Sequence, residues 1–130
     1  MILKLSLISC FGLLGVLSRY LLGILIQRVL PFQFPYATLS INIIGAFFVG
    51  VVYVLGIEGS MISPDIRIAL IVGFLGGFTT FSSYCLEGFR LIEQNLYLSA
   101  ILYLGGSPFL GVIATTTGIL ITRKLIAGSH

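Results

Sequence analysis

Four long apolar runs, separated by short polar breaks, make up most of the chain. They cover about residues 5–27, 37–57, 66–92 and 96–122. An α-helix of about 20 apolar residues is long enough to cross the hydrocarbon core of a membrane. Because each run reaches that length, the pattern predicts four transmembrane helices in a single domain, residues 1–130. The expected fold class is therefore an all-α membrane protein.

The composition agrees with this pattern and excludes several classes of protein. Of the 130 residues, 58% are hydrophobic and only 8% are charged, whereas a soluble domain has about 25% charged residues. A soluble fold of this size could not bury so much apolar surface, which excludes a soluble enzyme and a disordered tail. The net charge of +3 comes from scattered basic residues that form no patch for a phosphate backbone, so no nucleic-acid partner is expected.

Cysteine and histidine give no sign of metal or disulfide chemistry. Cys10 and Cys85 lie in apolar runs and are interpreted as small hydrophobic residues, and the one histidine is His130. We therefore expect no transition-metal site.

Basic residues give only a weak signal for the orientation of the chain in the membrane. With four spans, both termini lie on one side. That side collects Lys4, Arg67, Arg123 and Lys124, against Arg28 and Arg90 on the other. An excess of basic residues in the loops sets the orientation of a membrane protein, and a bias of four basic residues against two is weak enough to permit two interpretations. The chain inserts both ways and pairs antiparallel, or it keeps one orientation with a modest bias.

Polar side chains inside the runs are the candidates for function, because lipid does not tolerate them unpaired. Asn42 lies in the second run, and its amide carries two donors and an acceptor. It is expected to face either a partner helix or a water-filled path. Arg19 lies in the first run. Its side chain either reaches the membrane surface or has a structural or electrostatic role near an anion route.

The third run contains the least regular sequence, Gly76-Gly77-Phe-Thr79-Thr80. Adjacent glycines followed by threonines form a poor helix, so this pattern predicts a break near Gly76–Thr80. Non-helical backbone at membrane depth must be buried in protein or line a cavity. Its freed carbonyls could bind a hard cation such as Na⁺, or a partner chain could satisfy them. A simple packing kink is the alternative.

Two aromatic residues follow the break on one helix face. Phe81 and Tyr84 are three residues apart, and the edge of an aromatic ring is electropositive. Ring edges, hydroxyls and the Asn42 amide together would make an anion path lined by donors without a cation. Packing of these rings against lipid is the alternative.

Acidic residues are absent from the middle of the runs, since Glu87 and Glu93 come late in the third. A proton-coupled exporter would need a buried carboxylate. Small multidrug transporters share the four-span plan but carry a Glu in the first helix, where this chain has Arg19. Such an exporter and a non-transporting membrane subunit remain the alternatives. No nucleophile–base pair or paired carboxylates indicate an enzyme.

Three motifs occur in order along nearly the whole chain, and together they resemble the fluoride channel family (Fluc, also called CrcB). The motifs are Gly15-x-x-x-Arg19-Tyr20, Ser40-x-Asn42-x-x-Gly45-x-Phe47-x-x-Gly50 and Gly73-x-x-Gly76-Gly77-x-Thr79-Thr80-Phe81-Ser82-Ser83-Tyr84. The resemblance implies a fluoride-selective passive channel in the cell membrane that exports fluoride from the cytoplasm and limits its toxicity. It also implies an antiparallel, dual-topology homodimer with two pores.

The resemblance further assigns roles to individual residues. It implies that the carbonyls of Gly76 and Thr79 hold a structural Na⁺ at the dimer centre. Asn42 would donate to fluoride and Arg19 would match the family's first-helix arginine. The other residues of the implied fluoride pathway are Phe81, Tyr84, Ser82, Ser83, Thr115, Tyr103 and Ser107.

Three positions depart from the family pattern. Tyr84 stands where the family usually has a second Phe, and its phenol would give fluoride a further donor or narrow the path. Cys85 occupies a position that often carries a hydroxyl. Pro108 lies in the fourth run, where it removes a backbone hydrogen bond and is expected to kink the helix.

Overall fold

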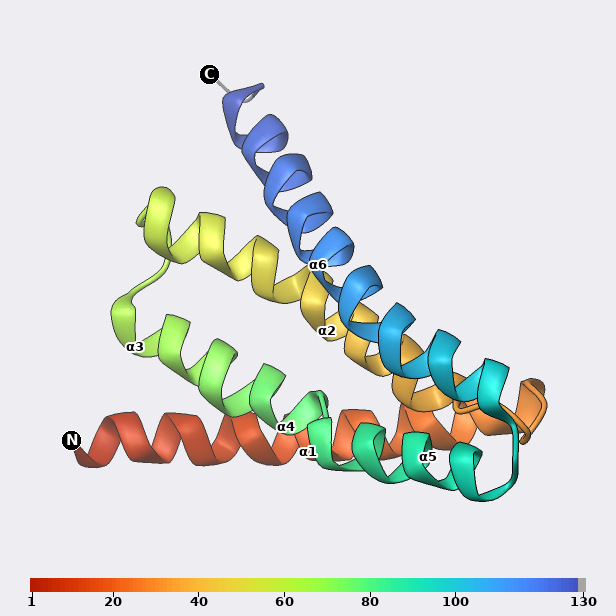
Figure 1. Cartoon of the computed structure of the whole chain (residues 1–130). Helices are drawn as coiled ribbons and strands as arrows, with labels where there is room; N and C mark the ends of the chain where they lie inside the picture. The colour runs from red at the N-terminus through yellow and green to blue at the C-terminus, as the bar shows by residue number, and fades with distance from the viewer. Residues whose placement is uncertain (129–130) are drawn as a thin grey trace.

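Helices account for nearly all of residues 1–128, the part of the chain that this computed structural model describes (Figure 1). Ser129 and His130, which include the single histidine considered above, lie outside the described residues. Four helical segments are long and apolar enough to cross a membrane. The prediction of an all-α protein with four transmembrane helices is confirmed.

The first, second and fourth segments are continuous. The first and last are the single α-helices α1 (Ile2–Val29) and α6 (Tyr97–Ala127). The second consists of α2 (Tyr36–Tyr53), which continues directly into the π-helical turn η1 (Val54–Glu58). In space, α6 runs beside α2, and α1 runs beside the first part of the third segment, residues 64–78 (Figure 1). The last part of that segment packs on α6.

The third segment is built from four pieces. They are α3 (Pro64–Ile68), η2 (Ala69–Leu75), α4 (Gly76–Phe78) and α5 (Phe81–Glu93). The first three follow one another without a gap, and extended backbone at Thr79 (ψ 161°) and Thr80 (φ −148°, ψ 124°) separates them from α5. The predicted break is therefore present, but the glycines do not form it, since Gly76 and Gly77 keep helical backbone.

Several glycines in this fold allow helices to pack closely. A Cβ atom on Gly15 of α1 would lie 2.1 Å from the carbonyl oxygen of Phe74, and one on Gly77 would lie 2.6 Å from that of Gly12. Small residues of this kind let membrane helices approach backbone to backbone. The sequence predicts that Gly76 and Gly77 unwind the helix. In the structure, Gly77 instead lets the third segment pack closely against α1.

The same device joins α2 to α6. A Cβ atom on Gly50 would lie 2.3 Å from the carbonyl oxygen of Thr115, and one on Gly118 would lie 2.2 Å from that of Phe47. Glycine contacts therefore close α1 onto η2 and α4, and α2 onto α6, whereas α5 packs on α6.

Replacing Gly15 with alanine should destabilise the fold by about 1–3 kcal/mol, because the new methyl group meets backbone that cannot rotate away. Thermal unfolding of the purified protein in detergent measures the effect. Gly23→Ala, on the same helix, is the matched control, since its Cβ would meet only the Ile41 side chain at 3.9 Å. Equal losses in both variants would show that the α1 contact is not tight.

Candidate functional site

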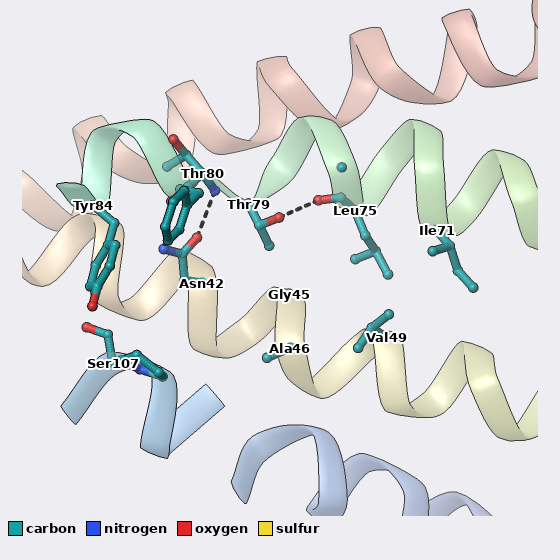
Figure 2. Close-up of a pocket in the computed structure, with 13 residues that line it drawn as sticks. Asn42, Gly45, Ala46, Val49, Ile71, Leu75, Thr79, Thr80, Tyr84 and Ser107 are labelled. Carbon is teal, nitrogen blue, oxygen red and sulfur yellow. Dashed lines mark hydrogen bonds between the residues drawn. The ribbon is translucent and has the colours of Figure 1, made fainter. Parts of the chain in front are cut away.

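A cavity of about 460 Å³ lies at the break in the third segment, between α2, η2, α5 and α6 (Figure 2). Its wall includes four side chains of the predicted fluoride pathway, which are Asn42, Phe81, Tyr84 and Ser107. Gly76 and Thr79, predicted to hold Na⁺, line it as well. No Lys, Arg, Asp or Glu is among the described residues that line this cavity.

Asn42 binds the backbone of the break at two points. Its side-chain oxygen accepts a hydrogen bond from the N–H of Thr80 at 2.8 Å, and its Nδ2 donates to the carbonyl of Thr80 at 3.0 Å (Figure 2). In an unbroken helix the Thr80 N–H would bond to the Gly76 carbonyl. Asn42 therefore takes the place of a helix partner and leaves the Gly76 carbonyl free. Its second N–H has no partner within residues 1–128 and remains a donor.

The threonines of the break cap the helix ends on either side. The Thr80 hydroxyl accepts from the backbone N–H of Ser83 at 3.3 Å and donates to the Ser83 hydroxyl at 3.0 Å, so it caps the start of α5. The Thr79 hydroxyl donates to the carbonyl of Leu75 at 2.8 Å. Because α5 begins at the cavity, the positive end of its dipole lies there, which favours an anion.

Arg19 contacts the break from the side of α1. Its Nε donates to the carbonyl of Gly77 at 3.0 Å, and the residue is half-buried. Of the two interpretations given to Arg19, the structure supports a structural role at the end of α4. The positive charge of Arg19 at the C-terminal end of α4 also interacts favourably with the negative end of the helix dipole.

Two carbonyls at the break are available to a cation. The Gly77 and Thr80 carbonyls bond to Arg19 and Asn42, whereas those of Gly76 and Thr79 accept no hydrogen bond from residues 1–128. Oxygen ligands suit a hard cation. The donor set therefore fits Na⁺, although two oxygens make only part of a coordination shell. Over the same residues, no group of three His, Cys, Asp or Glu side chains gathers to bind a metal.

Tyr84 and Ser107 form the α5–α6 wall of the cavity. The Tyr84 ring lies 5.7 Å from the Phe81 ring and 5.3 Å from the Tyr103 ring, measured between centroids. Its hydroxyl donates to the carbonyl of Leu104. Ser107 is buried, and within the described chain its hydroxyl has no partner, so it is an unpaired donor facing Tyr84 (Figure 2).

Four predicted pathway residues do not line this cavity. Ser82 is exposed, and Ser83 belongs to the cap of α5. The Thr115 hydroxyl donates to the carbonyl of Ala46 at 2.8 Å and so joins α6 to α2. Tyr103 is fully buried and bonds elsewhere. Their roles in conduction stay predictions.

Sequence reasoning missed a second polar cluster, centred on Glu87. Its carboxylate accepts from the Thr38 hydroxyl at 2.8 Å and from the Tyr103 hydroxyl at 2.6 Å. Glu87 also lines a second cavity of about 290 Å³, together with Arg90 and the loop between α1 and α2. One signal was available in the sequence, because Phe81, Tyr84 and Glu87 are spaced by three and share one face of α5.

Comparison with known proteins gives consistent matches over most of the chain. The family described as "CrcB-like protein, Camphor Resistance (CrcB)" matches residues 6–119. A protein of Geobacter sp. (strain M21) named fluoride-specific ion channel FluC is 41% identical over 118 residues, 91% of this chain and 95% of the relative. A protein of the same name from Chlorobium chlorochromatii (strain CaD3) is 43% identical over 117 residues, 90% of each chain.

Proposed function

This chain belongs to the CrcB family, and we propose that it is a fluoride-selective passive channel that exports fluoride from the cytoplasm and so limits its toxicity. It is a multi-pass protein of the cell membrane and not an enzyme. One observation carries the proposal beyond family membership. The cavity at the break gathers the Asn42 amide, the Ser107 hydroxyl and the Phe81 and Tyr84 rings, with no charged side chain in its described wall.

Fluoride is small and strongly hydrated, so a path across the membrane must replace its water with other donors. Binding at each point must also be weak enough for release, which favours several neutral donors in series. The second N–H of Asn42 and the free hydroxyl of Ser107 are such donors, and the N-terminus of α5 adds a positive potential. Ring edges of Phe81 and Tyr84 complete the set.

The proposed route follows one face of α5. The second cavity, at Glu87 and Arg90, opens near the α1–α2 loop, and the first lies at Tyr84 and Phe81. A carboxylate would repel fluoride, but the hydroxyls of Thr38 and Tyr103 both donate to Glu87 and partly neutralise its field.

The functional unit we propose is an antiparallel homodimer with two pores, one chain inserted each way. Phe81 lines the cavity yet is 76% exposed, so a single chain does not enclose the route and a second copy would complete its wall. The weak bias of basic residues allows both orientations.

A structural Na⁺ at the dimer centre is part of the proposal. The carbonyls of Gly76 and Thr79 from both copies would hold it. When bound, the ion supplies positive charge near the anion path and ties the two breaks together. The contribution of this chain is to keep those carbonyls free, through the bonds of Asn42 to Thr80.

Fluoride efflux from liposomes tests the function directly. Purified protein reconstituted into vesicles loaded with fluoride and chloride should release fluoride rapidly, read with a fluoride electrode, and retain chloride. Equal leakage of both anions would contradict selectivity. Substrate-driven proton flux would point instead to a proton-coupled exporter, and a protein that passes no ion alone would point to a non-transporting subunit.

A further inference from the structure

Pro108 removes one hydrogen bond from the middle of α6. The helix runs without interruption from Tyr97 to Ala127 with the proline inside it. Proline has no N–H, however, and the α-helical bond from residue 108 to the carbonyl of Leu104 cannot form. A carbonyl at membrane depth needs another donor, which in membrane helices often comes from a neighbouring helix.

Tyr84 supplies that donor from α5. Its phenolic hydroxyl donates to the carbonyl of Leu104, the group that Pro108 leaves without its helix partner. Both residues are departures from the family pattern noted in the sequence. The structure shows that they meet at one carbonyl, so the phenol at position 84 has a specific use in a chain with proline at 108.

This contact lies next to a stretch of α6 that is loosely packed within the chain. A Cβ atom on Gly105 or Gly106 would meet no described atom within 4 Å, so neither glycine is packed inside the chain. Before them, Leu104 packs on α5, where a Cβ on Gly88 would lie 2.3 Å from its side chain. After them, α6 is held to α2 at Thr115. The bond from Tyr84 therefore fixes the stretch in which the two anchored halves of α6 meet.

We propose that Tyr84 is a positioning residue of the fluoride path and that it acts as a pair with Pro108. Its hydroxyl replaces the N–H that the proline lacks, holds this stretch of α6 against α5, and thereby keeps the Ser107 hydroxyl directed at the cavity. The Tyr84 proton is engaged by a carbonyl, so Ser107, whose hydroxyl is unpartnered within the described chain, is the donor offered to the ion at this level. The functional part of this inference rests on the proposed function.

A double-mutant cycle at positions 84 and 108 tests the pair. In the natural background, Tyr84→Phe leaves the Leu104 carbonyl unpaired beside the cavity and should slow fluoride efflux from liposomes about tenfold. In the Pro108→Ala background the alanine N–H bonds to that carbonyl, so adding Tyr84→Phe should slow efflux by no more than about twofold. Equal slowing in both backgrounds would overturn the proposal, because the phenol would then act on fluoride itself. No slowing in either would overturn it as well.

Tyr103→Phe is the matched control, since its hydroxyl is also a buried donor but bonds to Glu87. Its effect on efflux should be the same in the natural and the Pro108→Ala backgrounds. Thermal unfolding of the same variants in detergent gives a second readout that needs no conduction. Tyr84→Phe should lower the melting temperature in the natural background and hardly change it in the Pro108→Ala background.

The two readouts separate the pair from the proposed function. If the unmodified protein passes no fluoride, the proposed channel function is contradicted. The melting temperatures of the variants would still decide whether Tyr84 and Pro108 are coupled. If Tyr84→Phe does not fold, recovery of folded protein on adding Pro108→Ala supports the pair, and failure to recover it overturns the pair.

Discussion

Alanine at position 42 should reduce fluoride efflux at least about a hundredfold. The substitution removes both partners of Thr80 at the break, and each backbone group left unpaired costs about 1–3 kcal/mol. The Thr80 N–H would then be free to bond with the Gly76 carbonyl, as in a continuous helix. Such a change would close the break, remove one proposed Na⁺ ligand and take away the amide donor of the cavity.

Aspartate at the same position separates the structural part of this effect from the ionic part. Asn42→Asp keeps an acceptor for the Thr80 N–H but loses both amide N–H groups and adds a negative charge. We expect it to preserve more of the melting temperature than Asn42→Ala while still blocking efflux. The measurements are the fluoride-electrode trace from liposomes and thermal unfolding in detergent. Undiminished efflux in Asn42→Ala would remove this residue from the path.

Replacing Phe81 with isoleucine should slow fluoride flux by about two orders of magnitude while the protein stays folded and keeps the oligomeric state of the unmodified protein. An aliphatic side chain of similar bulk has no electropositive edge, so the path loses a donor at the cavity wall. Because Phe81 is 76% exposed in the single chain, the folded chain should tolerate the change. Liposome efflux measures the rate, and size-exclusion chromatography in detergent reports the oligomer.

Phe89→Ile is the control for this experiment. Phe89 lies on the same helix and is 56% exposed, but it is not among the described residues that line either cavity. Its replacement should leave flux unchanged within about twofold. Similar losses at Phe81 and Phe89 would mean that helix α5 is sensitive to any loss of an aromatic ring, and Phe81 would have no special place in the path.

The architecture was readable from the sequence because lipid imposes one dominant rule. Backbone polar groups must be satisfied inside the membrane, so four long apolar runs can only be four helices. The position of the break was also readable, since Gly76-Gly77 and Thr79-Thr80 interrupt the third run. Its detailed form was not, because helix propensity cannot distinguish a glycine that unwinds a helix from one that lets two helices touch.

Side-chain partners were the part that no pattern along the chain could supply. Asn42 was recognised as a polar residue that needs a partner, but its partner, Thr80, is 38 residues away. The hydroxyl of Thr115 bonds to the carbonyl of Ala46, 69 residues away, a partner that the sequence does not indicate, and its predicted place on the ion path stays a prediction. Such pairings depend on which helix faces meet, which is decided by packing in three dimensions.

The glycine contacts between helices bear on how selectivity is achieved. Where backbone meets backbone, as at Gly15 and Gly118, a helix cannot slide without driving one main chain into another. The contact of α1 with η2 and α4, and the contact of α2 with α6, are therefore each expected to move as one rigid unit. We therefore expect the part of the proposed path that this chain contributes to keep a fixed shape, so that discrimination between halides of different size would rest on fit rather than on a moving gate.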